Sequence, residues 1–366
     1  MGKLLIASSA DSNFRYATGL NIPDPAIFFD FDGKQILLVN RLEFSRAKQQ
    51  VKQGVQVECW DDLTLRRKPV GRKRTLADIA AAYLLEKNIT AVDVPKEFWA
   101  LNLERLREHN IRPRIVDPFF PERRIKTPEE LKAIKATGTV TKKALKHALE
   151  ILKEAKIEWN DTLIWKNTPV TSEFLQNEIE KIFLENDCSS GETIVACGEH
   201  TAQPHNRGSG PIYAGKPIIL DLFPRSKATG YFFDVTRTVI KGTPSKELKD
   251  MYAVVKKAQQ EALAVVQPGK AEVIHNTAKE IFDRQNYKTE KEGFIHGTGH
   301  GLGLDIHEAP RIGSNSEDKL VAGDVITIEP GLYYKELGGI RIEDTVLVTK
   351  DGHINLTNLP KTFVIQ

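Results

Sequence analysis

Short apolar runs alternate with helical hydrophobic patterns along residues 1–116. Two apolar segments, Ala26–Phe29 and Gln35–Val39, flank the pair Asp32-Gly33, a pattern that predicts two strands joined by a tight hairpin turn. A further strand and two helices are predicted at Ala91–Val94, Leu76–Glu86 and Phe98–His109. Because strands and helices alternate, we expect this region to form a small α/β domain.

A proline-rich stretch, VDPFFPERRIKTPEE at residues 116–130, separates this region from the rest of the chain. A helix start follows, with Thr127 as the N-cap, Pro128 in the first turn and Glu130 completing a capping box. Apolar residues at helical spacing then define one face of a long helix: Leu131, Ile134, Leu145, Ala148, Leu149 and Leu152. Gly138 inside this helix costs it ~1 kcal/mol relative to alanine. We therefore expect a second domain at residues 123–366.

The second domain mixes helices with strands. Helical patterns occur near residues 172–185, 245–266 and 272–284. Strand-like segments are found at Pro217–Leu222, Tyr231–Ile240, Val325–Ile328 and Thr345–Val348. The expected fold class is therefore α/β of the α+β kind, in two domains.

Composition excludes several classes of protein. Of 366 residues, 28% are charged and 40% hydrophobic, and the net charge of +3 gives no support for nucleic-acid binding. The basic run between Arg66 and Arg74 has no interleaved aromatic residues, so we expect an exposed surface segment. No apolar stretch is long enough to form a signal-peptide core or a membrane span. With three cysteines and no CxxC spacing, the chain is predicted to be cytoplasmic.

Five residues of the second domain form a candidate metal-binding set: Asp221, Asp234, His300, Glu329 and Glu343. Four carboxylates and one imidazole suit a pair of adjacent divalent cations, because carboxylates can bridge two ions. Oxygen-rich ligands fit Mn²⁺, Co²⁺ or Zn²⁺ without thiolates. A two-metal centre generates a nucleophilic hydroxide at neutral pH and stabilises charge on an attacked carbonyl, which predicts a hydrolase.

The local sequence around these residues adds supporting groups. Thr236 follows Asp234 by two positions, on the same strand face, where its hydroxyl can hydrogen-bond the Asp234 carboxylate. Arg341 precedes Glu343 by two positions and is available to hold a carboxylate or a substrate. The glycines around His300 have an alternative interpretation as a dinucleotide fingerprint, but the spacing departs from GxGxxG and the strand–turn–helix context is poor.

Three further histidines are candidates for function. His296 and His307 lie on either side of His300, so that three of the chain's nine histidines fall within 12 residues. His205, in QPHN, has the weakest local evidence.

The chain resembles the metallopeptidase family of prolidase, aminopeptidase P and methionine aminopeptidase, which has the pita-bread fold. The segments that carry the resemblance are HGTGHGLGLDIHE, TIEPGLY, GGIRIEDTVLVT and GYFFDVTRT. The segment SNFRYATGLNIPDPAIFFD resembles the smaller N-terminal domain of the creatinase, prolidase and aminopeptidase P branch. The resemblance therefore implies a creatinase/prolidase-like domain at residues 1–122 and a pita-bread catalytic domain at residues 123–366.

The resemblance implies a role for each candidate residue. Asp221 and Asp234 would hold one metal ion and His300 and Glu329 the other, with Asp234 and Glu343 bridging. Glu329 would also act as a proton shuttle. His205 and His307 would position the substrate and stabilise the oxyanion, supported by three further residues that surround the ligands or face the substrate: His296, Arg341 and Thr236.

The implied reaction is hydrolysis of Xaa-Pro bonds in di- or oligopeptides by hydroxide held on two metal ions, Mn²⁺ being the first expectation. Prolidase and aminopeptidase P activities both stay open, as do a metal-free creatinase-like reaction and a peptide-binding module without catalysis. The resemblance also predicts a homodimer or higher homo-oligomer. One departure is Phe223, where the family has glycine, within an Asp221–Asp234 spacing of 13 residues that is about two longer than usual.

Overall fold

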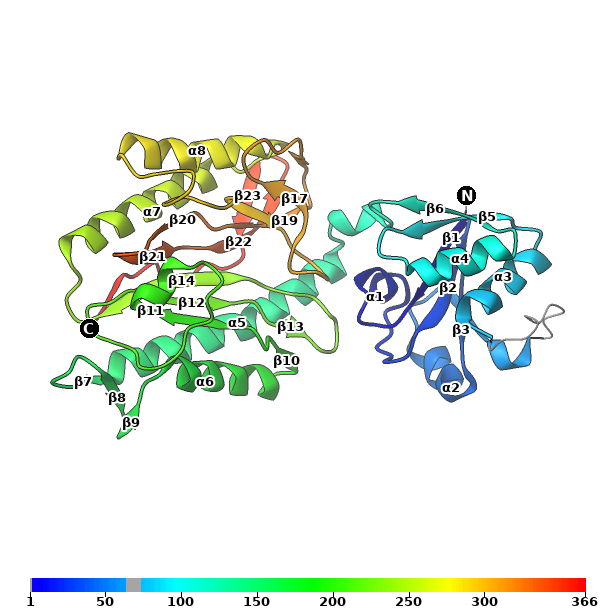
Figure 1. Ribbon diagram of the computed structural model, residues 1–366, viewed down its shortest axis with the longest axis horizontal. Coiled ribbons are helices and arrows are strands. Elements are labelled where there is room, and N and C mark those ends of the chain that lie inside the picture. The colour runs from blue at the N-terminus through cyan, green and yellow to red at the C-terminus, as the bar shows by residue number, and fades with distance from the viewer. Residues whose placement is uncertain (1, 64–73) are drawn as a thin grey trace. The chain divides into compact units, whose positions relative to one another are not determined.

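The computed structural model describes residues 2–63 and 74–366. It contains two compact units, Met1–Arg123 and Arg124–Gln366 (Figure 1). Most of the basic run, from Arg66 to Lys73, lies outside the described residues.

The first unit is built on a six-stranded sheet with strand order β4-β3-β2-β1-β5-β6. Its strands are β1 (Gly2–Ala7), β2 (Ala26–Phe31), β3 (Lys34–Val39), β4 (Val55–Cys59), β5 (Ala91–Pro95) and β6 (Arg112–Val116). Its α-helices are α1 (Ser12–Thr18), α2 (Arg41–Gln50), α3 (Leu76–Glu86) and α4 (Ala100–Glu108). Separate apolar clusters pack on the two sides of this sheet, so the unit has the mixed α/β character that was expected.

Several predicted elements of this unit are confirmed. Strands β2 and β3 pair antiparallel around Asp32 and Gly33, whose φ angles of 51° and 86° fit a tight hairpin turn. Helix α3 has the predicted bounds, whereas α4 begins at Ala100 because the preceding residues form a turn. The strands β1, β4 and β6 and the α-helices α1 and α2 were not predicted.

The second unit contains two main sheets. The first has the order β11-β12-β14-β24 and consists of β11 (Ile194–Cys197), β12 (Ile218–Leu222), β14 (Val235–Lys241) and β24 (Val364–Ile365). The second has the order β17-β16-β19-β22-β23 and consists of β16 (Gly299–Gly301), β17 (Glu308–Ile312), β19 (Val325–Ile328), β22 (Asp344–Thr349) and β23 (Gly352–Asn355). A separate hairpin joins β20 (Gly331–Tyr334) to β21 (Gly338–Arg341). The remaining short strands are β7 (Lys156–Ile157), β8 (Leu163–Trp165), β9 (Thr168–Pro169), β10 (Cys188–Ser189), β13 (Arg225–Ser226), β15 (Gly269–Lys270) and β18 (Lys319–Leu320).

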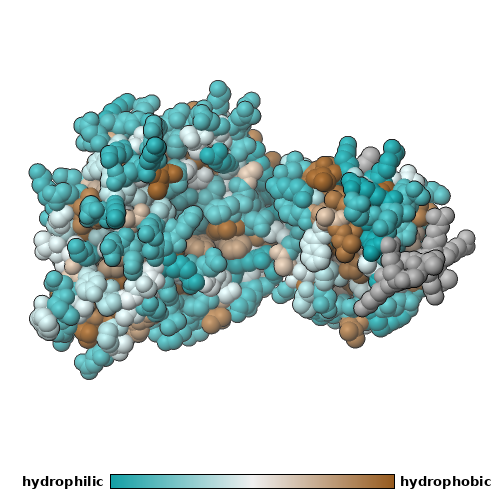
Figure 2. Space-filling view, in the orientation of Figure 1, coloured by the Kyte–Doolittle hydropathy of each residue, from teal (hydrophilic) through white to brown (hydrophobic). Residues whose placement is uncertain are grey.

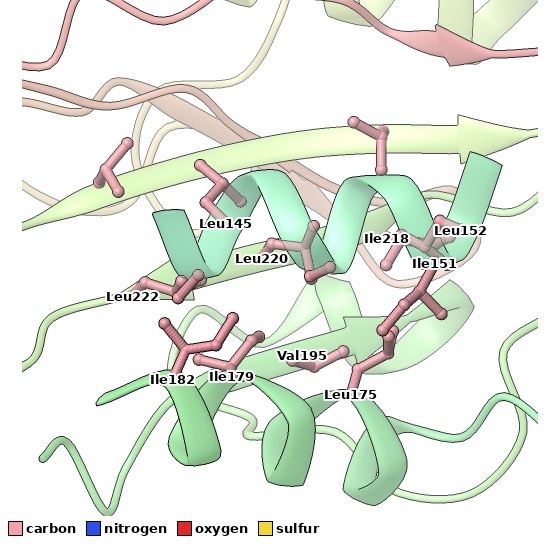
Figure 3. Close-up of a cluster of buried hydrophobic side chains, with 14 of the residues drawn as sticks. Leu145, Ile151, Leu152, Leu175, Ile179, Ile182, Val195, Ile218, Leu220 and Leu222 are labelled. Atoms are coloured by element: carbon pink, nitrogen blue, oxygen red, sulfur yellow. The ribbon is translucent and has the colours of Figure 1, made fainter. Parts of the chain in front are cut away.

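Two helix pairs lie on opposite sides of these strands (Figure 1). Helices α5 (Pro128–Glu154) and α6 (Ser172–Glu185) pack against the first sheet through buried aliphatic side chains such as Leu145, Ile179 and Leu220 (Figure 3). Helices α7 (Lys246–Ala264) and α8 (Glu272–Arg284) pack against the second sheet and the β20–β21 hairpin. The side chains between these layers exclude water, and the strand ends that they fix carry the candidate site.

The start of α5 confirms the predicted capping box. The Thr127 hydroxyl accepts a hydrogen bond from the Glu130 amide, and the Glu130 carboxylate accepts one from the Thr127 amide. The predicted strand Tyr231–Ile240 is wrong at its beginning, because β14 starts only at Val235. Residues Tyr231–Asp234 instead follow a turn, and Phe233 points into the core against α5.

Hydrophilic residues cover most of the face seen in Figure 2, with hydrophobic residues in small patches. Among the described helices, none has the length and apolar character needed to cross a membrane.

Candidate metal centre

The five predicted ligands all lie within or beside strands of the second unit. Asp221 is the fourth residue of β12, and Asp234 immediately precedes β14. His300 is the middle residue of β16, Glu329 directly follows β19, and Glu343 directly precedes β22. Because β12 pairs with β14, and β19 with both β16 and β22, pairing within each sheet brings these strand ends close together.

Distances between their side chains show that the five residues form one group. Nε2 of His300 lies 3.4 Å from Oε1 of Glu329 and 3.9 Å from Oδ2 of Asp234. One ligand atom from each of Asp234, His300 and Glu343 lies within 4.8 Å of the other two. Asp221 joins the group through Thr236, whose hydroxyl lies 2.8 Å from both Asp221 and Glu343. Thr236 was expected to hydrogen-bond the Asp234 carboxylate, but its hydroxyl contacts Asp221 and Glu343 instead, because Asp221 pairs directly with Thr236 and Asp234 precedes β14.

The carboxylates are buried and close to one another, so their ionised forms are unfavourable unless a cation is present. Burial, and repulsion by Asp221 and Glu329, raise the pKa of Asp234 well above its usual value. Burial and repulsion by Asp234 raise the pKa of Glu343 in the same way. Burial likewise raises the pKa of Glu329 to about 7. Oδ1 of Asp234 is buried without a hydrogen-bond partner among the described residues. A buried carboxylate oxygen without a partner is costly, so this arrangement fits divalent cations among the four carboxylates.

His300 has the protonation state that a metal ligand needs. Burial and the neighbouring His307 lower the pKa of His300 to about 4, which keeps the imidazole neutral at physiological pH. Its Nδ1 lies 3.0 Å from the carbonyl oxygen of Gly301. That contact fixes the proton on Nδ1 and leaves the Nε2 lone pair facing Glu329 and Asp234.

A buried hydrogen-bond network supports the carboxylates from one side. Nη2 of Arg341 donates to Oδ2 of Asp221 at 2.7 Å, and Nη1 donates to the hydroxyl of Tyr333 at 2.7 Å. The same hydroxyl lies 2.9 Å from Nε2 of His296. Burial and Arg341 lower the pKa of His296 to about 3, so His296 is a neutral imidazole. Arg341 and His296 lie where sequence reasoning expected, but Tyr333 was missed.

The other two histidines lie beside the ligands. The ring of His307 packs edge-to-face on that of His300, with centroids 4.4 Å apart. Partial burial lowers the pKa of His307, with a further contribution from His205. His205 lines a cavity of about 500 Å³ with Gln203, Pro204, Asn206, Ile295 and His296. His205 and His296 therefore line the same cavity.

The unusual loop after Asp221 leaves the strand pairing intact. Asp221 pairs with Thr236 in the β12–β14 register, as a regular antiparallel ladder requires. The extra residues form a turn that is closed where Nε of Arg225 donates to the carbonyl oxygen of Gly230. Phe223 packs against a small apolar cluster that includes Tyr333. The long spacing is thus absorbed in the loop.

Comparison with known proteins identifies the family. Residues 132–350, more than half of the chain, match the model of metallopeptidase family M24. The chain belongs to metallopeptidase family M24. This family membership implies divalent metal ions as cofactors, in agreement with the carboxylate-rich centre.

Individual relatives resemble the chain in amino-acid sequence and in three-dimensional structure. The Xaa-Pro dipeptidase of Pyrococcus furiosus is 37% identical over 248 residues, which cover 67% of this chain and 66%, just under two thirds, of that protein. The solved prolidase from the same organism has a TM-score of 0.80 at 27% identity, covering 98% of this chain and 96% of that one. An X-Pro aminopeptidase from Thermotoga maritima shares the fold, with a TM-score of 0.82 at 23% identity, over 100% of this chain and 97% of that chain. The two-domain pita-bread fold is therefore confirmed.

Proposed function

We propose that this chain hydrolyses the peptide bond between an N-terminal residue and proline, in a reaction that depends on divalent metal ions. The observation that carries the proposal is the five-residue ligand group beside a cavity lined by His205 and His296. The names of the similar Xaa-Pro dipeptidase and prolidase support the choice of substrate.

In this proposal Asp221 and Asp234 would hold one ion and His300 and Glu329 the other, and Asp234 and Glu343 would be shared between the two. When bound, two such ions supply an activated water as nucleophile and stabilise negative charge on the carbonyl oxygen. Glu329 accepts a proton from the attacking water and returns it to the departing proline nitrogen.

Residues around the ligands bind and orient the substrate. His205 and His307 donate hydrogen bonds to the carbonyl oxygen as it gains charge. Arg341 and Tyr333 hold Asp221 and His296 in fixed positions, which reduces the reorganisation needed during the reaction.

A small pocket suits the Xaa-Pro bond. That bond is a tertiary amide without an N–H group, and its cis form is substantially populated, so recognition has to use the ring and a free terminus. The cavity of about 500 Å³ falls within the range of about 300–1,000 Å³ typical of small-ligand sites. Both dipeptides and longer peptides remain candidates for the natural substrate.

The proposal also covers the metal ion, the role of the first unit and the assembly of the protein. Mn²⁺ is the first candidate ion, because the ligand group is rich in carboxylate oxygens and contains no thiolate. The first unit acts as a creatinase/prolidase-like N-terminal domain, and the protein forms a homodimer or higher homo-oligomer. The three free cysteines are buried thiols, which is consistent with a reducing cytoplasm.

The test is hydrolysis of an Xaa-Pro dipeptide and an Xaa-Pro-Xaa tripeptide after chelator treatment and reloading with Mn²⁺, Co²⁺ or Zn²⁺. We expect cleavage that is lost without metal and restored by reloading, and the preferred length assigns dipeptidase or aminopeptidase activity. Stoichiometric metal binding without cleavage of either peptide would contradict the proposal and favour a binding module. Turnover of a small guanidino compound without metal would favour the creatinase-like alternative.

A further inference from the structure

A buried ion pair lies next to one of the proposed substrate-binding histidines. Nζ of Lys126 lies 3.0 Å from Oε2 of Glu308, and only 2% and 10% of these two side chains are exposed. A buried charge is tolerated only when it is paired, so each of these residues depends on the other. Lys126 comes from the segment before α5, whereas Glu308 follows His307 directly.

The Glu308 carboxylate organises the turn that precedes it. Its Oε1 accepts hydrogen bonds from the amides of Leu304 and Asp305, at 3.0 and 3.1 Å. A Cβ atom at Gly303 would lie 2.6 Å from Oε2, so the backbone of the turn is closed tightly around this carboxylate. Residues 303–308 are thus wrapped around one charged group.

The same turn carries His307. It begins two residues after the irregularity between His300 and Gly301 in the β16–β17 pairing, and it ends at Glu308. The His307 ring lies against the ring of His300, so a shift of the turn would change the distance between the two histidines. The position of His307 therefore depends on the Glu308 carboxylate.

We propose that Lys126 is a positioning residue for His307. By neutralising the buried Glu308 carboxylate, Lys126 holds the 303–308 turn closed and His307 at its distance from His300. The inference rests on the proposed function, in which His307 contacts the substrate, but it concerns a residue outside both the ligand group and the cavity.

The segment before α5 contains a matched control. Arg124, two residues earlier, makes a bidentate pair with the buried Asp324 through Nε and Nη2, both at 2.8 Å. Asp324 accepts a hydrogen bond from the Val321 amide and so closes a different turn. Loss of either pair should destabilise the protein, but only the Lys126 pair reaches the turn of His307.

The experiment compares Lys126→Met with Arg124→Met in the metal-loaded full chain. We expect Lys126→Met to lower kcat for an Xaa-Pro dipeptide by about 10- to 100-fold, the order expected for a displacement of about 1 Å, with unchanged metal content. Arg124→Met should change kcat by less than about threefold. Because Lys126 acts through His307, adding Lys126→Met to His307→Ala should cost little more than His307→Ala alone.

A second measurement does not depend on activity. Amide hydrogen exchange at Leu304 and Asp305 should become faster in Lys126→Met and stay unchanged in Arg124→Met. Glu308→Gln, which keeps an acceptor for these amides, replaces Lys126→Met if the latter fails to fold. Full additivity with His307→Ala, equal losses in the two methionine variants, or unchanged exchange would overturn the inference. A wild-type chain without peptidase activity would contradict the proposed function, while the exchange data would still decide on the turn.

Discussion

The hydroxyl oxygen of Thr236 lies 2.8 Å from Oε2 of Glu343, and the same oxygen lies 2.8 Å from Oδ1 of Asp221. A hydroxyl carries one proton and can donate to only one of these carboxyl groups. The other contact needs a proton on the carboxyl group itself. Burial and Asp234 raise the pKa of Glu343, so Glu343 takes up a proton at a higher pH than an ordinary glutamate does.

Thr236→Val should weaken metal binding without unfolding the protein. Valine has nearly the same shape but lacks the hydroxyl that orients Asp221 and Glu343. Loss of a group that orients metal ligands typically costs 10- to 100-fold in affinity, and we expect a loss of that order by titration calorimetry. Thr238→Val is the matched control, because Thr238 is equally buried on β14 but its hydroxyl bonds to the Arg341 backbone rather than to a carboxylate. Equal affinities in the two variants would contradict this role.

Metal binding should release protons and strengthen as the pH rises. Burial and mutual repulsion raise the pKa values of Asp234 and Glu343, and that of Glu329 to about 7. The metal-free centre therefore retains protons near neutral pH, and cations bind the deprotonated form. Calorimetry in buffers of different ionisation enthalpy, between pH 6 and pH 8, should show proton release that decreases toward high pH. Binding without proton release would show that the ligands are already ionised.

Much of the fold and most of the site follow from local sequence. Helix α3 and the start of α5 were predictable because capping residues and apolar spacing act within a few positions. The candidate ligand group could be proposed from the sequence because an acidic residue inside a β-type segment, as at Asp234, is costly to bury unless it is paired or binds a metal ion. The start of β14 was not predictable, since burial of Phe233 against α5 depends on distant residues.

Tyr333 shows why the rest of the site could not be predicted. It lies within the apolar β20–β21 hairpin, and its neighbouring sequence indicates an ordinary aromatic residue of the core. Its place in the network depends on its hydroxyl, which contacts Arg341 across the hairpin and His296 from a segment 37 residues earlier. A contact made through tertiary folding leaves no signal in the spacing of neighbouring residues.

Tyr333→Phe should lower activity more than stability. The change leaves Nη1 of Arg341 and Nε2 of His296 without the hydroxyl partner, a cost of about 1–3 kcal/mol for buried polar groups. Part of that free-energy cost raises the activation barrier of the reaction, so we expect kcat/KM for an Xaa-Pro dipeptide to fall at least about tenfold. Tyr334→Phe is the control, because the Tyr334 hydroxyl accepts a hydrogen bond from the Lys288 amide, outside the network of Tyr333. Similar kinetics in the two variants would remove Tyr333 from the site.

Gly138→Ala should destabilise the protein although alanine favours helices. A Cβ at this position would lie 2.5 Å from the ring of Phe233, and such overpacking costs about 1–3 kcal/mol, against a helix gain of ~1 kcal/mol. Because Phe233 precedes Asp234, a displaced ring also shifts a proposed ligand, so metal affinity should fall as well. Urea unfolding and metal titration measure the two effects.

The effect at Gly138 can be separated from helix propensity within the same helix. Ala136 is exposed, so Ala136→Gly there measures propensity alone and should cost ~1 kcal/mol without changing metal affinity. Phe233→Leu in the Gly138→Ala background removes the ring that the new methyl group meets, so it should restore much of the metal affinity. If Gly138→Ala instead stabilises the protein, the ring of Phe233 has room to move, and α5 does not constrain the position of Asp234.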